Sequence, residues 1–375
     1  MDEYQLDKPL IVKENIPTAM PAESRPVSVS NNEVAALSSE QSGFKKRDRQ
    51  IMNSPQDAAK GIHIVSLGDG GPRWAGQIES KVGQSADVLW DFQACGLPYV
   101  WSHYGARGEG VNVFVLDSGI DRFHPSFAHS ESIKAMSFVT GCDPQDGCGH
   151  GTWVAGKIAG MGIGLAPKCN FYSLKVLDDS GTGTVDFTNK ALEWILRQPV
   201  QPHVINMSLG TPRKSALQEK LLWQLYKKGC IIIVAAGNEG DDEKFYPAAY
   251  SGVVAVAAVD KNKSRASFSN FGANIAVSAP GVACYSAYPG GSFRLLEGTS
   301  MASPTVAGLV TLGLCYARKR SAANPSYLRD LVLSSLEETA QDLGTVGRDP
   351  YYGFGCIDGK AFFARLELKL NALVS

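Results

Sequence analysis

Ser300, His150, Asp117 and Asn238 are the residues of this chain whose types and spacing could perform chemistry. Together they supply the groups that acyl transfer to a hydroxyl requires. Ser300 stands in Gly-Thr-Ser-Met-Ala-Ser-Pro, directly before an apolar helical pattern, and a helix N-terminus offers backbone N–H groups that can stabilise an oxyanion. Serine is also a favoured helix cap, so this segment alone favours a structural role.

Asp117 and His150 lie in two further segments that change this interpretation. Asp117 ends the apolar run Val-Phe-Val-Leu, so its carboxylate is expected at the carboxyl end of a strand, where open α/β sheets bind ligands. His150 lies between two glycines at the start of a small-residue helix. Each has an ordinary alternative, a turn-capping aspartate and a structural histidine.

Asn238 follows the apolar run Cys-Ile-Ile-Ile-Val-Ala-Ala, and its amide can point into the same crevice. Alone it would be an ordinary loop residue. Acyl transfer to serine needs a base for the hydroxyl proton, an acid that holds the base in the right tautomer, and donors for the oxyanion. The four residues together therefore indicate catalysis.

The elements that must position these residues form an alternating pattern. Nearly continuous apolar runs, typical of strands covered on both faces, are separated by helical segments. The pattern predicts an α/β fold with a mostly parallel central sheet and helices on both faces, and sites at the carboxyl ends of the strands. The strand candidates are residues 111–116, 171–176, 203–207, 230–236 and 253–259.

The clearest helix is expected from Ser215 to Lys228, with Gly229 as its stop signal. One of its faces carries four leucines, Leu217, Leu221, Leu222 and Leu225.

The motifs of the chain, read together, resemble those of the subtilisin-like serine proteases, with the catalytic domain closest to the proteinase K branch. The resemblance runs from about Gly96 to the C-terminus and implies the three-layer subtilisin-like fold. It implies that Asp117 orients the imidazole, that His150 is the general base and then the general acid, and that Ser300 is the nucleophile. Asn238 and the backbone N–H of Ser300 would form the oxyanion hole. The motifs are VLDSGI, GHGTWVAG, INMSLG, VAAGNEG, SFSNFG, APG, GTSMASPTVAGL and YGFGCIDGKAF.

The same resemblance implies substrate contacts. One strip would pair with an extended substrate backbone and line one wall of the primary pocket, and a second strip would form the opposite wall. Phe245 and Tyr246 follow Asn238 at about the distance of the pocket floor, which indicates an apolar or aromatic preference. The strips are Ser208, Leu209 and Gly210 for the first wall and Ala236 and Gly237 for the second.

Three positions depart from the family pattern. Trp153 and Thr305 stand where the family usually has histidines, and we expect them to alter pocket-wall packing without removing chemistry. Ala276 stands where relatives often carry an aspartate near a cation site. Since no set of oxygen ligands can be assembled, we expect no required metal and no cofactor.

The N-terminal region is expected to differ from the rest. Residues 1–55 are predicted to be a flexible extension, residues 56–95 a prosegment or a permanent embellishment, and residues 96–375 the catalytic domain. The middle unit reads as strand, helix and strand, the second strand being Ala-Asp-Val-Leu-Trp-Asp-Phe. An intramolecular inhibitory segment would be removed between about Trp90 and Leu97.

Composition limits the partners and the compartment. The 36 basic and 37 acidic residues favour neither nucleic acid nor an anionic membrane. The resemblance implies protein or peptide substrates, and we expect a monomer. No signal peptide or spanning segment is readable, which predicts a cytoplasmic protein, with secretion as the alternative from family habit. The eight cysteines are expected to be buried free thiols, with a local Cys142–Cys148 bridge as the alternative.

Two other functions fit the same motifs. A catalytically silent or masked binding protein could use the protease scaffold, although the retention of all four catalytic residues counts against it. An esterase or peptide ligase would use the same acyl-enzyme and would differ from a peptidase in its products.

Overall fold

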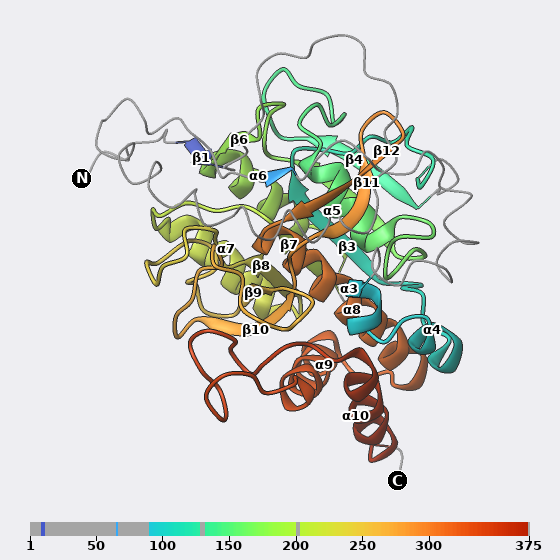
Figure 1. The fold of residues 1–375 in the computed structure, drawn as a ribbon. Helices are drawn as coiled ribbons and strands as arrows, with labels where there is room; N and C mark the ends of the chain where they lie inside the picture. Colours follow the sequence, from blue (N-terminus) through green and yellow to red (C-terminus); the bar gives the residue numbers. More distant parts are fainter. Residues whose placement is uncertain (1–8, 12–64, 67–89, 128–131, 200–202, 374–375) are drawn as a thin grey trace, which may run out of the picture.

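The computed structural model describes residues 9–11, 65–66, 90–127, 132–199 and 203–373. Its centre is a parallel sheet of seven strands in the order β10-β9-β8-β7-β3-β5-β4 (Figure 1). The strands are β3 (Asn112–Asp117), β4 (Ile133–Ser137), β5 (Asn170–Lys175), β7 (His203–Met207), β8 (Ile231–Ala235), β9 (Val254–Val259) and β10 (Ile275–Pro280). The predicted sheet is confirmed, and β4 and β10 are edge strands that the apolar runs did not predict.

The sheet separates two apolar cores because successive residues of a strand face opposite sides. In β3, Val113 and Val115 face one core, whereas Phe114 and Leu116 face the other. All four side chains are almost fully buried, which explains why the central strands read as continuous apolar runs.

Helices cover both faces of the sheet and form a three-layer α/β fold (Figure 1). One pair of helices packs in the core that contains Phe114 and Leu116. A second group of helices packs in the core that contains Val113 and Val115. The first pair is α6 (Val185–Leu196) and α7 (Ala216–Lys227). The second group is α5 (His150–Ala159), α8 (Thr299–Arg320), α9 (Pro325–Thr339) and α10 (Gly359–Asn371).

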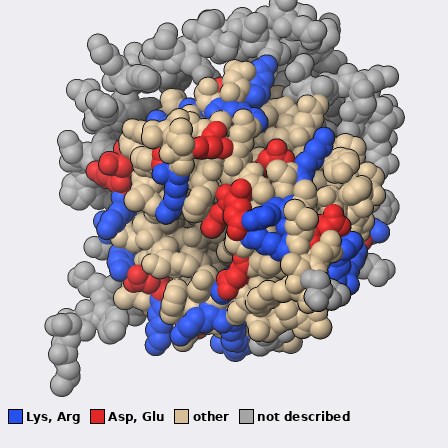
Figure 2. Space-filling model, turned by 90° about the horizontal axis from the view of Figure 1, so that it is seen from below, with Lys and Arg blue, Asp and Glu red and all other residues tan. Residues whose placement is uncertain are grey.

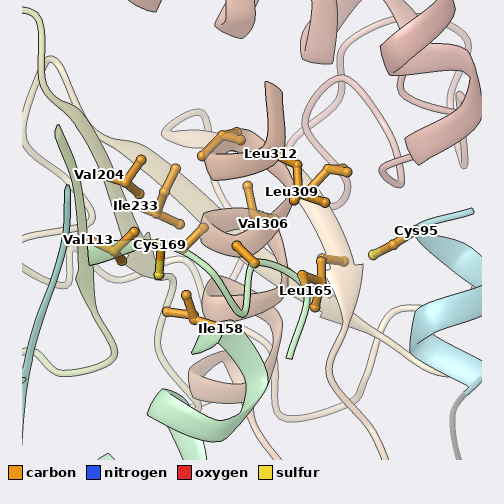
Figure 3. Packing of buried hydrophobic residues seen from close by; sticks show 14 of the residues in the cluster. Cys95, Val113, Ile158, Leu165, Cys169, Val204, Ile233, Val306, Leu309 and Leu312 are labelled. Atoms are coloured by element: carbon orange, nitrogen blue, oxygen red, sulfur yellow. The ribbon is translucent and has the colours of Figure 1, made fainter. Parts of the chain in front are cut away.

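Helix α8 is the centre of the larger core. Figure 3 shows Val306, Leu309 and Leu312 of this helix among apolar side chains from the sheet and from α5. Within the described ranges α8 alone has the length and mean hydropathy, 1.3, of a membrane-spanning helix, and the apolar window behind this value is 100% buried inside the protein. The start of α8, which carries Ser300, is therefore held by packing along most of the helix.

Helix α7 confirms most of the prediction for this segment. The side chain of Ser215 caps the helix by accepting from the backbone N–H of Gln218, and Gly229 follows its end with a φ of 90°. Leu217 was wrongly placed on the buried face, since it is 47% exposed, and Gln218 is buried instead. The buried positions 218, 221, 222 and 225 have the spacing of one helical face.

Residues 90–104 correct one prediction about the N-terminal region. Trp90 and the next four residues form the helix α3 (Trp90–Ala94), not the end of a strand, and α4 (Tyr99–Tyr104) follows it. Phe92 and Cys95 are buried in the same core as α8. Residues from Trp90 onwards therefore pack into the same core, and the domain bounds predicted from the sequence stay a prediction.

Two short strands lie outside the main sheet near the N-terminus. β1 (Pro9–Ile11) pairs antiparallel with β6 (Thr182–Thr184). β2 (Val65–Ser66), within one predicted strand, pairs with β12 (Ser292–Glu297), which also pairs with β11 (Cys284–Tyr288). The helix expected within residues 56–95, and most of the N-terminal segment in which no signal peptide was readable, lie outside the described residues.

The cysteines are free, as expected, and seven of the eight are buried. Burial raises the pKa of Cys169 and of Cys230 to about 12, so these thiols stay protonated at neutral pH. Cys142 is partly exposed, and no bridge joins it to Cys148.

The surface formed by α9 and α10 mixes charges of both signs (Figure 2). Glu338 of α9 pairs with Arg365 and Lys369 of α10 at 2.6 and 2.7 Å. Exposed pairs of this kind contribute at most about 1 kcal/mol each. They hold two neighbouring helices together without creating a large field of one sign on this face.

A buried ion pair joins α3 to α5. The Lys157 ammonium contacts the Asp91 carboxylate, and both side chains are at most 1% exposed. The Lys157 ammonium also lies 5.0 Å from the ring centroid of Phe92. Residues 90–94 are therefore anchored to the helix that begins with His150.

We expect Lys157→Met to lower the free energy of unfolding by about 3–5 kcal/mol, because it leaves the Asp91 carboxylate buried without a cation. The double variant Asp91→Leu/Lys157→Met removes both charges and should recover most of this loss. Urea unfolding measures both effects. A single variant with the wild-type midpoint would contradict the importance of the pair.

Candidate active site

The sheet brings Asp117 and His150 together at its carboxyl edge. Asp117 is the last residue of β3, and His150 is the first residue of α5. His150 Nδ1 lies 2.6 Å from Asp117 Oδ1, and both side chains are fully buried. Since an ionised carboxylate only accepts hydrogen bonds, Nδ1 carries the proton and Nε2 presents a lone pair. The neutral imidazole is thereby held in the tautomer that a base requires.

Ser118 and Asp146 fix the positions of this pair. Ser118 follows Asp117, and its Oγ donates to Asp146 Oδ1 at 2.9 Å and accepts from the N–H of Gly151 at 2.9 Å. Ser118, which follows Asp117, is thus bonded directly to Gly151, which follows His150.

The Asp146 carboxylate also caps the N-terminus of α5. Its Oδ1 accepts from the N–H of Gly149 at 2.8 Å, and its Oδ2 accepts from the N–H and Oγ1 of Thr152 at 2.7 and 2.6 Å. Asp146 is 3% exposed, so these bonds are protected from water. A carboxylate at this position satisfies free N–H groups and opposes the positive end of the helix dipole.

Two glycines permit this close approach of strand and helix. Gly149 has a φ of 99°, which a larger residue would adopt only with strain. A Cβ on Gly151 would lie 2.2 Å from the backbone oxygen of Gly119. The glycines around His150 therefore bring its backbone against the end of β3, which the sequence suggested but did not specify.

A buried lysine supports the same region from the neighbouring strand. Lys175 pairs with Asp117 across β3 and β5, and its Nζ donates to the backbone oxygen of Ser118 at 2.5 Å and to Asp179 at 2.7 Å. The hydrogen bond from Lys175 lowers the pKa of Asp179. The N–H of Gly147 also donates to this carboxylate at 3.2 Å, so Asp179 links β5 to the loop before His150.

Ser300 lies in the first turn of α8 and is 2% exposed. Its Oγ donates to the backbone oxygen of Ser208 at 3.3 Å. Asn238 Oδ1 accepts from the N–H and the Oγ1 of Thr299 at 2.9 and 2.8 Å. These bonds orient the amide so that its Nδ2 lies beside Gly298. A Cβ built on Gly298 would lie 3.5 Å from this nitrogen. The amide donor is therefore held at the start of the helix that carries the serine.

The two predicted wall strips start next to this helix. Ser208 Oγ contacts Ser303 Oγ at 2.8 Å and donates to the backbone oxygen of Ser300 at 3.1 Å, and the N–H of Gly237 donates to Thr299 Oγ1 at 3.2 Å. Both strips are thus fixed to α8 by side-chain hydrogen bonds.

Leu209 and Ala236 face away from the space between the strips. Both side chains are at most 2% exposed and pack in the core that contains Phe114. Only their backbone atoms are available to a ligand, so we expect these two residues to contribute main-chain contacts.

Trp153 and Thr305 have structural positions. Trp153 Nε1 donates to the backbone oxygen of Arg294 at 3.0 Å, and Thr305 Oγ1 donates to the backbone oxygen of Met301 at 3.1 Å. Both are fully buried. The structure therefore places both side chains in the core, and their expected effect on the packing of the pocket wall stays a prediction.

In the described ranges no three His, Cys, Asp or Glu side chains gather as metal ligands would. The expectation that no metal is required stays a prediction.

Burial raises the pKa of Glu297, which ends β12 and precedes the serine segment.

Sequence reasoning missed Ser118, Asp146 and Lys175. A signal for Asp146 existed, since an acidic residue shortly before a helix predicts a cap. Nothing in the sequence indicates that Lys175 bonds to Ser118, because that contact depends on the pairing of two strands that lie far apart in the chain.

Comparisons with known proteins match the same part of the chain. The family model described as "Subtilase family" matches residues 108–355. Subtilisin Savinase from Lederbergia lenta is 40% identical over 265 residues, which are 68% of this chain and 92% of the relative. Subtilisin DY from Bacillus licheniformis is 39% identical over 267 residues, with the same two shares. Alkaline protease from Shouchella clausii is 40% identical over 265 residues, 68% of this chain and 65% of the relative.

We expect Asp146→Asn to slow the labelling of Ser300 by a serine-directed fluorophosphonate about a hundredfold. The amide cannot accept all the bonds that the carboxylate accepts, and a displacement of about 1 Å at a reacting group costs about this much. Asp143→Asn is the matched control, because Asp143 lies in the same loop and accepts only from the exposed N–H of Gln145. Equal labelling rates of Asp146→Asn and wild type would contradict the positioning role.

Proposed function

This chain belongs to the subtilase family and is a serine endopeptidase, and we propose that Asp117, His150, Ser300 and Asn238 carry its reaction. The observation that carries this assignment is the buried 2.6 Å contact between Asp117 and His150, which leaves Nε2 as the basic atom. The matched relatives are subtilisins and alkaline proteases, and closeness to the proteinase K branch stays a prediction.

The first half of the reaction forms the acyl-enzyme. Ser300 Oγ leaves its 3.3 Å bond to Ser208, gives its proton to His150 Nε2 and attacks the scissile carbonyl carbon. The oxyanion accepts from Asn238 Nδ2 and from the N–H of Ser300 at the positive end of α8. Asp117 stabilises the imidazolium that forms.

The second half releases both products. His150 gives the proton to the departing amine, whose bond to the carbonyl carbon breaks. A water molecule then gives a proton to the same imidazole and attacks the acyl-enzyme, and Ser300 recovers its proton when the acid product leaves. The reaction is complete without a cofactor.

An extended peptide is the substrate form that the surroundings of Ser300 favour. The strip Ser208–Gly210 would pair with the backbone of the substrate through main-chain groups. The edge of β6 accepts an extended segment as well, because β1 pairs there in antiparallel register. We therefore propose protein or peptide substrates bound between these two edges.

We propose that the N-terminal region is an intramolecular inhibitory segment. β1 pairs with β6, and the turn that joins β5 to β6 contains Asp179, which is bonded to Lys175 and to the loop before His150. A segment paired there occupies an edge close to the catalytic pair. Since residues from Trp90 onwards belong to the compact domain, removal of the segment would require a cut before Trp90 and not between Trp90 and Leu97.

Ser300→Ala should lower kcat for peptide hydrolysis by roughly a million-fold, as removal of the nucleophile does in subtilisin, and abolish labelling by a serine-directed phosphonate. Asn238→Ala should keep the labelling site and lower kcat by about 10²–10³-fold. Casein and peptide p-nitroanilide assays measure both. Turnover that persists in Ser300→Ala would exclude the assignment of Ser300.

Cleavage of the folded full chain at an inserted protease site within residues 80–85 should raise the initial rate about tenfold or more, because a tethered segment acts at high effective concentration. A synthetic peptide of residues 1–20 should then inhibit competitively. The same peptide with Leu10→Pro is the control, since proline removes the N–H that a strand pair needs.

Two outcomes would contradict this inhibitory role. An unchanged rate after the cut would exclude masking by the N-terminal region. Cut protein that neither hydrolyses casein nor reacts with the phosphonate would favour a silent binding protein on the subtilase scaffold.

A further inference from the structure

The side chain of Phe245 lies against both predicted wall strips. A Cβ built on Gly210 would lie 2.2 Å from Phe245 Cε1, and a Cβ built on Gly237 would lie 3.2 Å from Phe245 Cδ1. One edge of the same ring therefore touches the backbone of both strips. The sequence placed Phe245 at the pocket floor and predicted an apolar or aromatic preference, but the contacts show how far the ring extends between the two walls.

The backbone that carries Phe245 is fixed on both sides. Thr211 and Tyr246 exchange two backbone hydrogen bonds, each 2.8 Å long, directly beside Gly210 and Phe245. The backbone oxygen of Phe245 also accepts from the N–H of Ala249 at 2.8 Å. The ring is half-buried and packs against the core that contains Phe114.

The wall opposite Gly210 is equally fixed. The N–H of Asn270 donates to the backbone oxygen of Gly237 at 3.0 Å, and a Cβ on Gly237 would lie 2.3 Å from Asn270 Nδ2. Asn270 Oδ1 accepts from the N–H groups of Glu239 and Gly240 at 2.8 and 2.9 Å. Neither wall can move outward without breaking these bonds. The slot therefore cannot widen to make up for the volume that the Phe245 ring occupies.

The slot between the strips begins at the reacting serine. The Ser208 backbone oxygen accepts from Ser300 Oγ, and Gly237 is bonded to Thr299, the neighbour of Ser300. The side chain of the residue whose carbonyl Ser300 attacks must enter this slot. Leu209 and Ala236 face the core, so the glycines and the Phe245 ring define its width.

We propose that Phe245 fills the depth of the primary pocket and restricts cleavage to bonds that follow small residues such as alanine, glycine and serine. This inference rests on the proposed role of Ser300 and names the substrate class of the same site. An aromatic side chain would have to occupy the volume of the Phe245 ring. The aromatic preference expected from the sequence is therefore replaced by a preference for small side chains.

The size of the effect follows from the behaviour of apolar pockets. One methylene more or less changes kcat/KM by about 10–200-fold, and overfilling a packed space costs about 1–3 kcal/mol. Pockets that differ in depth separate proteases with aromatic preference from those with small-residue preference. We therefore expect the wild-type protein to hydrolyse an alanine substrate at least about tenfold more efficiently than the phenylalanine substrate.

The test uses the full chain and four tetrapeptide p-nitroanilides that differ only in the residue before the cleaved bond, which is alanine, valine, leucine or phenylalanine. In Phe245→Ala, kcat/KM for the phenylalanine substrate should rise about tenfold to a hundredfold, and the value for the alanine substrate should change less than threefold. If Phe245 had a purely structural role, its replacement would not invert the ratio of kcat/KM for the phenylalanine substrate to kcat/KM for the alanine substrate.

Tyr226→Ala is the matched control. Like Phe245, Tyr226 is a partly buried aromatic residue that packs against the core that contains Phe114. It differs in position, because it lies in the last turn of α7, just before the chain enters the amino end of β8. Its truncation should lower stability without changing the substrate ratio. If Phe245→Ala does not fold, Phe245→Leu and the substrate series on the wild-type protein decide the question.

Preference of the wild-type protein for phenylalanine over alanine would overturn the inference, and so would an unchanged ratio in Phe245→Ala or in Phe245→Leu. Failure of the proposed function gives a different result. In that case the wild-type protein hydrolyses none of the four substrates and does not react with phosphonates that carry either a methyl or a benzyl group.

Discussion

The buried carboxylate of Asp146 is the group on which the geometry of the active site depends. It accepts hydrogen bonds from the hydroxyl of Ser118, the residue that follows Asp117 at the end of β3, and from N–H groups at the start of the helix of His150. A carboxylate with this many donors is costly to replace, since each unsatisfied donor would remain buried. The 2.6 Å contact between Asp117 and His150 is therefore a consequence of how strand and helix are joined. The larger core then holds α8, with Ser300, against the same edge of the sheet.

The sequence predicted the parts of the fold whose residues are buried on both sides. The strand at residues 203–207 was predicted with its observed bounds, because every residue in it is buried. Edge strand β4 was not predicted, since its residues are only partly buried and its pattern is weaker. Gln218 is buried and Leu217 is exposed because tertiary packing, not residue type, decides which side of α7 is covered. For Trp90–Ala94, the partner Lys157 lies 66 positions further along the chain, so no local pattern indicates the helix.

The same distinction applies to the candidate site. Asp117, His150, Asn238 and Ser300 stand in short motifs whose chemistry is readable from residue type and order. The residues that orient them are not readable in this way, because a hydrogen bond such as that from Lys175 to the backbone of Ser118 requires the register of two strands. Motifs therefore indicate which groups react, and the packing of the sheet determines how accurately they are held.

Substrate specificity depends on a third kind of information, namely which side chains reach the walls of the pocket from other parts of the chain. The walls beside Ser300 contain glycines, and a glycine wall has no side chain of its own that limits a ligand. The free space is then set by whichever residue reaches the glycines from another part of the chain, and here this residue is Phe245. Its influence comes from a loop whose sequence and length are not constrained by the reaction. A chain can therefore keep all the groups that acyl transfer requires and still accept a different class of substrate, because the depth of the pocket and the chemistry of Ser300 are determined by separate elements of the fold.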